Sequence, residues 1–216
     1  MAYTTIDDPS AHFHVNLHTG NETNNTDITF DANAGDFQPD WVWFKGRTSS
    51  AIDHALFDSS RGTGKHLISN STAAENTQGA TLKAFNSNGF RVGDDAGDYG
   101  VNKSGRTYVT WNWKCNGGSA SASGSESGNN VAYSRQTNTT AGFSIITYTG
   151  IGTSSSGSPV VPHGLGVVPD MLIIKNRSSN STDWAVWFKV ENSAGTNVFQ
   201  GFDTGAHGGS GGAAHF

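Results

Sequence analysis

Three histidines near the start of the chain carry nitrogen donors at a spacing that suits a transition metal. His12, His14 and His18 have the same parity, so on a strand their imidazoles share one face of a sheet. Neutral imidazoles arranged in this way hold Zn²⁺ and similar ions. The alternative is that they are ordinary histidines of an exposed or edge strand. The pattern therefore gives a metal site and a plain strand as competing predictions.

Three carboxylates are concentrated in one Gly-containing turn, at Asp94, Asp95 and Asp98. Clustered oxygen ligands are what Ca²⁺ prefers, but the turn lacks the ligand spacing and the closing Glu of an EF-hand loop. A solvated acidic turn is the competing interpretation. The sequence requires no cofactor, and Ca²⁺ or a transition metal enters only through these two groups.

No motif in the sequence indicates a catalytic nucleophile. The single Gly-x-Ser-x-Gly match, at 208–212, lies in a Gly-rich tail with no apolar strand before it. Cys115 is the only cysteine, so it forms no internal disulfide and is expected to behave as a small hydrophobe. We therefore predict no catalytic residues and a protein that is not an enzyme.

Three tryptophans stand next to polar residues in the way that sugar-binding platforms require. Trp111, Trp113 and Trp184 can expose a ring face, and such faces stack on sugars while neighbouring polar groups bind hydroxyls. Trp41 and Trp43 lie in a continuous apolar run and are expected to belong to the core. The first three are the predicted glycan-binding residues.

The amino-acid composition and net charge limit the kinds of molecule that the protein is expected to bind. Among 216 residues there are 28 Gly, and 13 Lys and Arg stand against 18 Asp and Glu, a net charge of −5. No two basic residues are adjacent, so a phosphate-binding surface and a nucleic-acid partner are not expected. No apolar run approaches the length of a membrane span, and the first residues do not resemble a secretory signal. We expect synthesis in a cytoplasm and no membrane insertion.

Short apolar segments predict the β-strands that carry these candidate site residues. The runs 41–44 and 171–174 each follow Pro-Asp and fit strands buried on both faces. The segments 107–113 and 143–148 are rich in β-branched and aromatic residues and partly alternate, which is typical of strands with one wet face. Gly- and Asn-containing turns separate them. The sequence predicts an all-β protein of antiparallel β-sandwiches, jelly-roll or concanavalin-like.

An internal repeat in the sequence predicts how the chain divides into units. A shift of 130 residues aligns 13–20 with 143–150, 39–47 with 169–177, and 53–57 with 183–187, all without a gap. We predict a first β-sandwich unit at 1–114, a Gly/Ser-rich linker or surface loop at 115–140, and a second, shortened unit at 141–216. The repeated polar positions 40/170, 45/175 and 47/177 flank the central strand and are expected to be structural.

The second unit lacks counterparts of the last strands of the first. Those counterparts would lie beyond residue 216, and a sheet without them has an unpaired edge. We predict that a neighbouring subunit covers this edge in a homo-oligomer, with a trimer favoured. The alternative is that the second unit is a smaller sandwich.

A family resemblance rests on six segments of this chain: QPDWVWFKGR at 38–47, LFDSSRG at 56–62, SNGFRVG at 87–93, YVTWNWK at 108–114, TAGFSIITYTG at 140–150 and HGLGVVPD at 163–170. Together they resemble a virion-protein domain that is common in tailed phages, especially marine ones. The resemblance covers about 12–114 and 137–190. It implies a structural protein of the particle, tail-fibre-like or of unknown function, and it implies no catalytic residues.

The function expected from these observations is a non-enzymatic virion component. It would be made in the host cytoplasm and displayed on the particle as a tail fibre or head decoration. Other virion proteins, further copies of the chain and host-surface glycans are the expected partners. The alternatives are a glycan-depolymerising enzyme on a concanavalin-like sandwich, which needs two carboxylates in a Trp-lined groove, and a free carbohydrate-binding module.

Overall fold

The computed structural model describes residues 8–31, 35–48, 52–128, 130–152, 159–191 and 197–201. The described residues confirm the predicted all-β class, because strands joined in antiparallel sheets and one short 3-10 helix make up the regular structure. The Gly-rich tail at 204–216, with its Gly-x-Ser-x-Gly match, lies outside the described residues. The first half contains η1 (Pro9–Ala11), β1 (Phe13–Thr19), β2 (Thr26–Thr29), β3 (Trp41–Gly46), β4 (Ala55–Asp58), β5 (Lys65–Ile68), β6 (Asn76–Thr77), β7 (Leu82–Asn86), β8 (Gly89–Val92) and β9 (Thr107–Trp113). The second half contains β10 (Ala122–Gly124), β11 (Ala132–Asn138), β12 (Phe143–Thr149), β13 (Met171–Ile174), β14 (Ala185–Glu191) and β15 (Asn197–Gly201).

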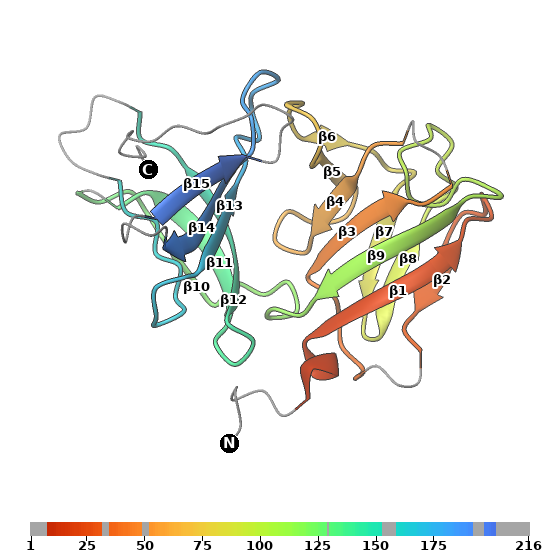
Figure 1. Ribbon diagram of the computed structural model, residues 1–216, viewed down its shortest axis with the longest axis horizontal. Coiled ribbons are helices and arrows are strands. Elements are labelled where there is room, and N and C mark those ends of the chain that lie inside the picture. The colour runs from red at the N-terminus through yellow and green to blue at the C-terminus, as the bar shows by residue number, and fades with distance from the viewer. Residues whose placement is uncertain are drawn as a thin grey trace.

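Two sheets form the first half (Figure 1). The larger has the strand order β1-β9-β3-β4-β5-β6 and the smaller the order β2-β8-β7. Both sheets contribute side chains to one core, in which Phe44 of the larger sheet contacts Phe57 of the same sheet and Phe90 of the smaller one. Burial of these aromatic rings is the main force that holds the two sheets face to face.

Alternation along β3 and β9 gives the larger sheet two different faces. Val42 and Phe44 of β3 point into the core, whereas Trp41 and Trp43 lie on the opposite face. On β9, Trp111 and Trp113 share that opposite face with them, as the pairing of Trp43 with Trp111 shows. The period of two residues that defines a strand therefore concentrates tryptophan on the outer face of the six-stranded sheet.

In the second half, the described residues form two three-stranded sheets, β10-β11-β12 and β13-β14-β15. Two of these strands, β10 and β11, fall within 115–140, where the sequence predicts a linker or surface loop. The prediction of a loop there rested on the small residues at 116–128, but strand pairing uses the backbone, and Ser123 and Gly124 pair with Ser134 and Tyr133.

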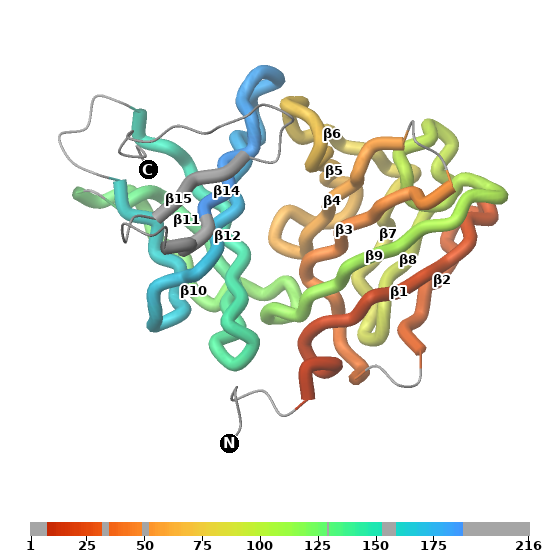
Figure 2. Tube along the Cα trace, viewed as in Figure 1, coloured from red at the N-terminus to blue at the C-terminus, as the bar shows by residue number. Residues whose placement is uncertain are grey.

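The second half packs beside the outer face of the six-stranded sheet (Figure 2). Leu56 and Leu67 of β4 and β5 form an apolar cluster with Trp184, and Ile173 of β13 packs against it together with Trp41 and Trp43. The continuous apolar run predicts a strand buried on both faces with Trp41 and Trp43 in the core. The core-facing side of β3 is buried, but Trp41 and Trp43 are only half-buried on its outer face, because the second half covers that face incompletely.

Candidate binding cleft between the two halves

A cleft of about 2290 Å³ separates the strands of the second half and opens onto the outer face of the six-stranded sheet. Its apolar surface comes from both halves, with a floor of tryptophans and walls formed by β12 and β13. The aromatic residues that line it are Trp41, Trp43, Trp113, Phe143, Tyr148, Trp184 and Trp187.

Aromatic rings meet where the floor joins the β12 wall. The ring of Phe143 lies 5.7 Å from that of Trp41 and 6.3 Å from that of Trp113, centroid to centroid, and the two indoles are 6.0 Å apart. These distances are in the range of favourable aromatic pairs. The floor of the cleft is therefore a preformed aromatic surface.

The walls are strand edges. Successive residues of a strand point to opposite faces, yet neighbouring positions of β12, such as Ile146 and Thr147, both line the cleft, as do Leu172 and Ile173 of β13. Among the described residues, β12 pairs with β11 alone and β13 with β14 alone. The cleft is thus bordered by one free edge of each sheet.

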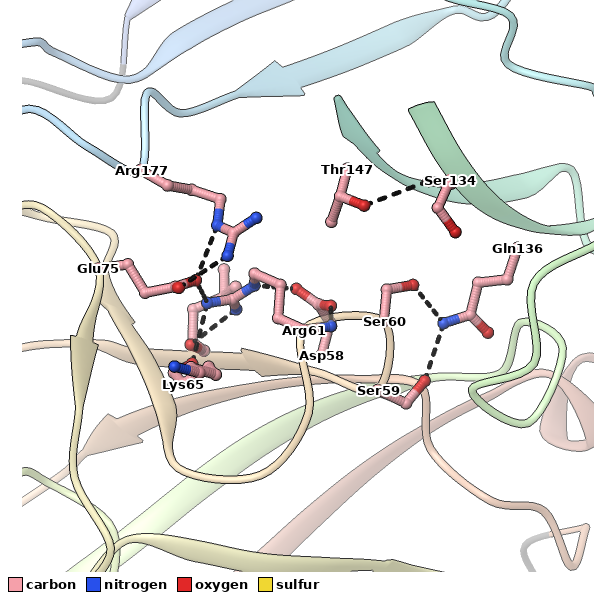
Figure 3. Close-up of polar contacts among 11 residues, drawn as sticks. Asp58, Ser59, Ser60, Arg61, Lys65, Glu75, Ser134, Gln136, Thr147 and Arg177 are labelled. Atoms are coloured by element: carbon pink, nitrogen blue, oxygen red, sulfur yellow. Dashed lines mark hydrogen bonds and ion pairs between the residues drawn. The ribbon is translucent and has the colours of Figure 1, made fainter. Parts of the chain in front are cut away.

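Charged side chains connect the halves at one end of the cleft (Figure 3). Arg177 donates to both carboxylate oxygens of Glu75, at 2.7 and 2.8 Å. Glu75 also accepts from Arg61 at 3.0 Å, and Arg61 in turn pairs with Asp58. Burial acts to raise the pKa of Glu75, but the hydrogen bonds from Arg177 and Arg61 outweigh it and lower that pKa. Glu75 is therefore an ionised structural group and is unsuited to act as a general acid.

Lys175 reinforces the same junction. Its Nζ donates to the carbonyl of Thr72 in the first half at 2.9 Å and to that of Thr182 at 2.7 Å. Burial lowers the pKa of Lys175. Lys175 and Arg177 thus make structural contacts, as the sequence predicts for them, while Arg47, which the 130-residue shift aligns with Arg177, is exposed.

Gln136 is a second bridge, which the sequence analysis missed. It is fully buried on β11, and its Nε2 donates to the hydroxyls of Ser59 and Ser60 at 2.8 and 2.7 Å (Figure 3). Its Oε1 accepts from the backbone N–H groups of Asn116 and Gly118. A buried amide whose donors and acceptor are all satisfied fixes its neighbours in one arrangement.

Asp40 of the first half binds the same serine and the same backbone segment that Gln136 contacts. This buried carboxylate accepts hydrogen bonds from the hydroxyl of Ser59 and from the N–H groups of Cys115 and Gly117, at 2.6, 2.6 and 3.0 Å. Cys115 is buried, as expected of a small hydrophobe, and burial together with the charge of Asp40 raises the pKa of its thiol to about 12.

The three predicted glycan-binding tryptophans lie in different surroundings. Trp113 lies on the cleft floor, and Trp111 is half-buried beside Trp43, 5.8 Å from it between ring centroids. Trp184 is only 7% exposed, and its Nε1 donates to the carbonyls of Ile68 and Ser71. Its indole therefore joins the halves and has no ring face open to a sugar.

Of the three predicted histidine ligands, His14 and His18 lie on the core-facing side of β1 and His12 directly precedes that strand. His14 packs on Phe30, and His18 stacks on Tyr108 and bonds the carbonyl of Val101 at 2.9 Å. His12 follows η1 and lies 3.4 Å from the side-chain nitrogen of Asn138. Burial lowers the pKa of His18.

The acidic turn is organised around one carboxylate. Asp95 is fully buried and accepts from the N–H groups of Tyr99, Val101 and Asn102 at 2.7 to 3.0 Å. Asp98 pairs with Arg106, and Asp94 stays at the surface side of the turn, where it accepts from a nearby N–H. Within the described ranges, no three His, Cys, Asp or Glu side chains converge to hold a metal ion.

A smaller pocket of about 350 Å³ lies beside the charged junction. His66 lines it, stacked on Phe57 at 5.5 Å, and its Nε2 has no hydrogen-bond partner in the structure. Burial and the charge of Arg61 lower the pKa of His66 to about 4, so the ring is neutral at pH 7. Sequence reasoning gave no signal for this histidine, because only the fold buries it.

Comparisons with known proteins give a family and no function. A search of curated proteins and a search of solved structures found no match to this chain. In the part of the chain that the structure describes, no helix is both long and apolar enough to cross a bilayer. One family model matches residues 8–212, and its description is "Domain of unknown function (DUF7483)". Because this match spans almost the whole chain, the protein belongs to the DUF7483 family.

Proposed function

We propose that the protein is a non-enzymatic structural component of a virion surface, on a tail fibre or as a head decoration, and that it acts through assembly and binding. The observation that carries the proposal is the cleft: a large, preformed aromatic surface bordered by strand edges, whose ionised carboxylate Glu75 is held by two arginines. Such a surface suits binding of another molecule. The virion role itself comes from the sequence resemblance.

We further propose that the two halves are copies of one sandwich unit, of the jelly-roll or concanavalin-like kind, related by the shift of 130 residues. Strand β12, at 143–149, has the bounds of β1, at 13–19, after that shift. Ala132 and Tyr133 at the start of β11 likewise repeat Ala2 and Tyr3 in the sequence. These coincidences support a common origin of the halves.

Host-surface glycans are the proposed ligands of the half-buried tryptophans on the outer sheet face. Trp111 and Trp113 are the residues that retain this role, since they lie on the outer sheet face, whereas Trp184 is buried. The matched variants are Trp111→Ala and Val109→Ala, which lie two residues apart on the same face of β9. Loss of binding to a glycan array for Trp111→Ala alone supports the proposal, and equal binding by both variants contradicts it.

Two measurements test the assembly and the location. Light scattering coupled to size exclusion gives the mass of the purified chain, for which a trimer or larger assembly is expected and a monomer would contradict homo-oligomeric assembly. Antibodies raised against the chain should label intact virus particles in electron micrographs. Unlabelled particles alongside labelled free protein would refute the virion role.

A further inference from the structure

The strand order of the two halves differs by one strand. In the first half, β9 lies between β1 and β3, and the order continues with β4 and β5. Under the shift of 130 residues, β12, β13 and β14 correspond to β1, β3 and β4. Among the described residues, no strand lies between β12 and β13, and the cleft occupies that position.

Hydrogen bonds fix which backbone groups of β12 face the cleft. The carbonyls of Ser134 and Gln136 on β11 accept bonds from the hydroxyls of Thr147 and Ser144, so they point toward β12. In the register of this pair, Ser134 and Gln136 lie opposite Thr147 and Ile145. Because successive residues direct their N–H and C=O groups to opposite sides, the odd-numbered residues of β12 bond β11.

The even-numbered residues therefore present the free edge. Their N–H and C=O groups, at Ser144, Ile146 and Tyr148, point away from β11 and toward the cleft. On β1, the bonds of Lys114 N–H to His12 and of Gly20 N–H to Arg106 show that even-numbered residues bond β9. The edge that β1 offers to β9 is thus the edge that β12 leaves free, at positions related by the same shift.

We propose that the cleft between β12 and β13 receives an extended strand of a second polypeptide, which joins β12 to β13 as β9 joins β1 to β3. This inference rests on the repeat proposed above and is independent of the virion role. Addition of a strand to a free edge satisfies backbone groups, and pockets for alternate side chains give selectivity.

The surroundings define the chemistry of the incoming strand. One of its faces would lie over the aromatic floor of Trp41, Trp113 and Phe143, so alternate residues should be aromatic or β-branched. Strand β9 itself, with Trp111 and Trp113 on one face, has this pattern. The carboxylates at the cleft already have cations beside them, Glu75 with Arg61 and Arg177 and Asp183 with Lys175, so the aromatic and β-branched pattern of the strand sets the selectivity.

The test uses a labelled peptide with the sequence of residues 106–114, added to the intact protein. We expect saturable binding by fluorescence anisotropy, and protection of the Ser144, Ile146 and Tyr148 amides in hydrogen exchange. Ile146→Pro removes an N–H that faces the cleft and leaves the β11 bonds in place, so it should weaken binding at least about tenfold. Ile146→Val, which keeps the N–H, is the matched control and should bind like the unmodified protein.

The outcomes separate this inference from the proposed assembly. If a second copy already fills the site, the three amides are protected without peptide and lose protection on dilution, which supports the inference. Rapid exchange of these amides with and without peptide, or equal binding by Ile146→Pro and Ile146→Val, would overturn it. A monomeric protein that binds the peptide would contradict homo-oligomeric assembly but would support a strand-binding site between β12 and β13.

Discussion

The guanidinium of Arg177 in the second half and the carboxylate of Glu75 in the first are joined by two parallel hydrogen bonds across 102 positions of sequence. Glu75 simultaneously accepts from Arg61, whose side chain is 3% exposed. The pair therefore links a surface cation to a buried one through a single carboxylate. How much each member stabilises the protein depends on how far it is removed from water.

Removal of the Arg177 side chain should reduce the stability of the protein only slightly. Because its side chain is 42% exposed, solvent screens the pair, and Arg177→Ala is expected to lower the free energy of unfolding by about 1 kcal/mol. Arg47→Ala is the control, since the 130-residue shift of the sequence aligns Arg47 with Arg177 and Arg47 is exposed. Urea denaturation of both variants measures the difference.

Removal of the Glu75 side chain should reduce the stability of the protein more than removal of Arg177. Glu75→Ala leaves the buried guanidinium of Arg61 with Asp58 as its remaining carboxylate, and we expect a loss of about 3 kcal/mol in the same experiment. A loss no larger than that of Arg177→Ala would show that Arg61 does not depend on Glu75.

Gln136→Leu should destabilise the contact between the halves. The substitution keeps a side chain of similar size but leaves two backbone N–H groups without their acceptor and removes the donor to the hydroxyls of Ser59 and Ser60, for an expected cost of about 2 to 4 kcal/mol. Ser134→Ala, at an exposed position of the same strand, should be close to neutral. Equal unfolding midpoints for the two variants would contradict the bridging role.

Stability should fall on acidification because of His66. Its pKa is about 4 in the folded protein and about 6.5 when unfolded. Between these values the unfolded state binds the proton first, so stability is complete above pH 6.5 and decreases as the pH falls toward 4, by up to about 3 kcal/mol. His66→Phe, which can keep the stacking on Phe57, should flatten the pH profile. Parallel profiles for the two proteins would assign the acid sensitivity to other groups.

Cys115 should be inert in the folded protein. Burial and Asp40 raise the pKa of its thiol to about 12, so almost no thiolate exists at pH 8. We expect iodoacetamide to modify Cys115 only after urea unfolds the chain, as followed by mass spectrometry. Rapid labelling without denaturant would show that the junction around Asp40 opens readily.

Asp95→Ala should unfold the acidic turn. It removes the acceptor of three N–H groups and replaces a residue with a φ of 53°, a conformation that Asp tolerates better than Ala. We expect a loss of about 2 to 3 kcal/mol, against about 0.5 kcal/mol for Asp94→Ala. A rise in melting temperature with Ca²⁺ that Asp95→Ala abolishes would instead assign the turn to a metal site.

Local sequence patterns predicted the strands well and the contacts between them poorly. The runs at 41–44, 107–113 and 143–148 became β3, β9 and β12, because apolar and β-branched residues specify strands over a few positions. Gln136 and His66 carried no such signal, since only the pairing of distant strands buries them. The polar segment around Gln136 resembles a loop in composition, which explains why β11 was not predicted there.

The pairing of β1 with β9 sets the order of events during synthesis. Asn112 of β9 donates to the carbonyl of His14 of β1 across 98 positions. At ribosomal speeds β1 therefore emerges roughly 5 to 20 seconds before its partner. Contacts of such high sequence separation also slow folding, because the chain must close a long loop first. The six-stranded sheet thus matures late, and a nascent chain that stops before β9 exposes its tryptophan-rich β3 to aggregation.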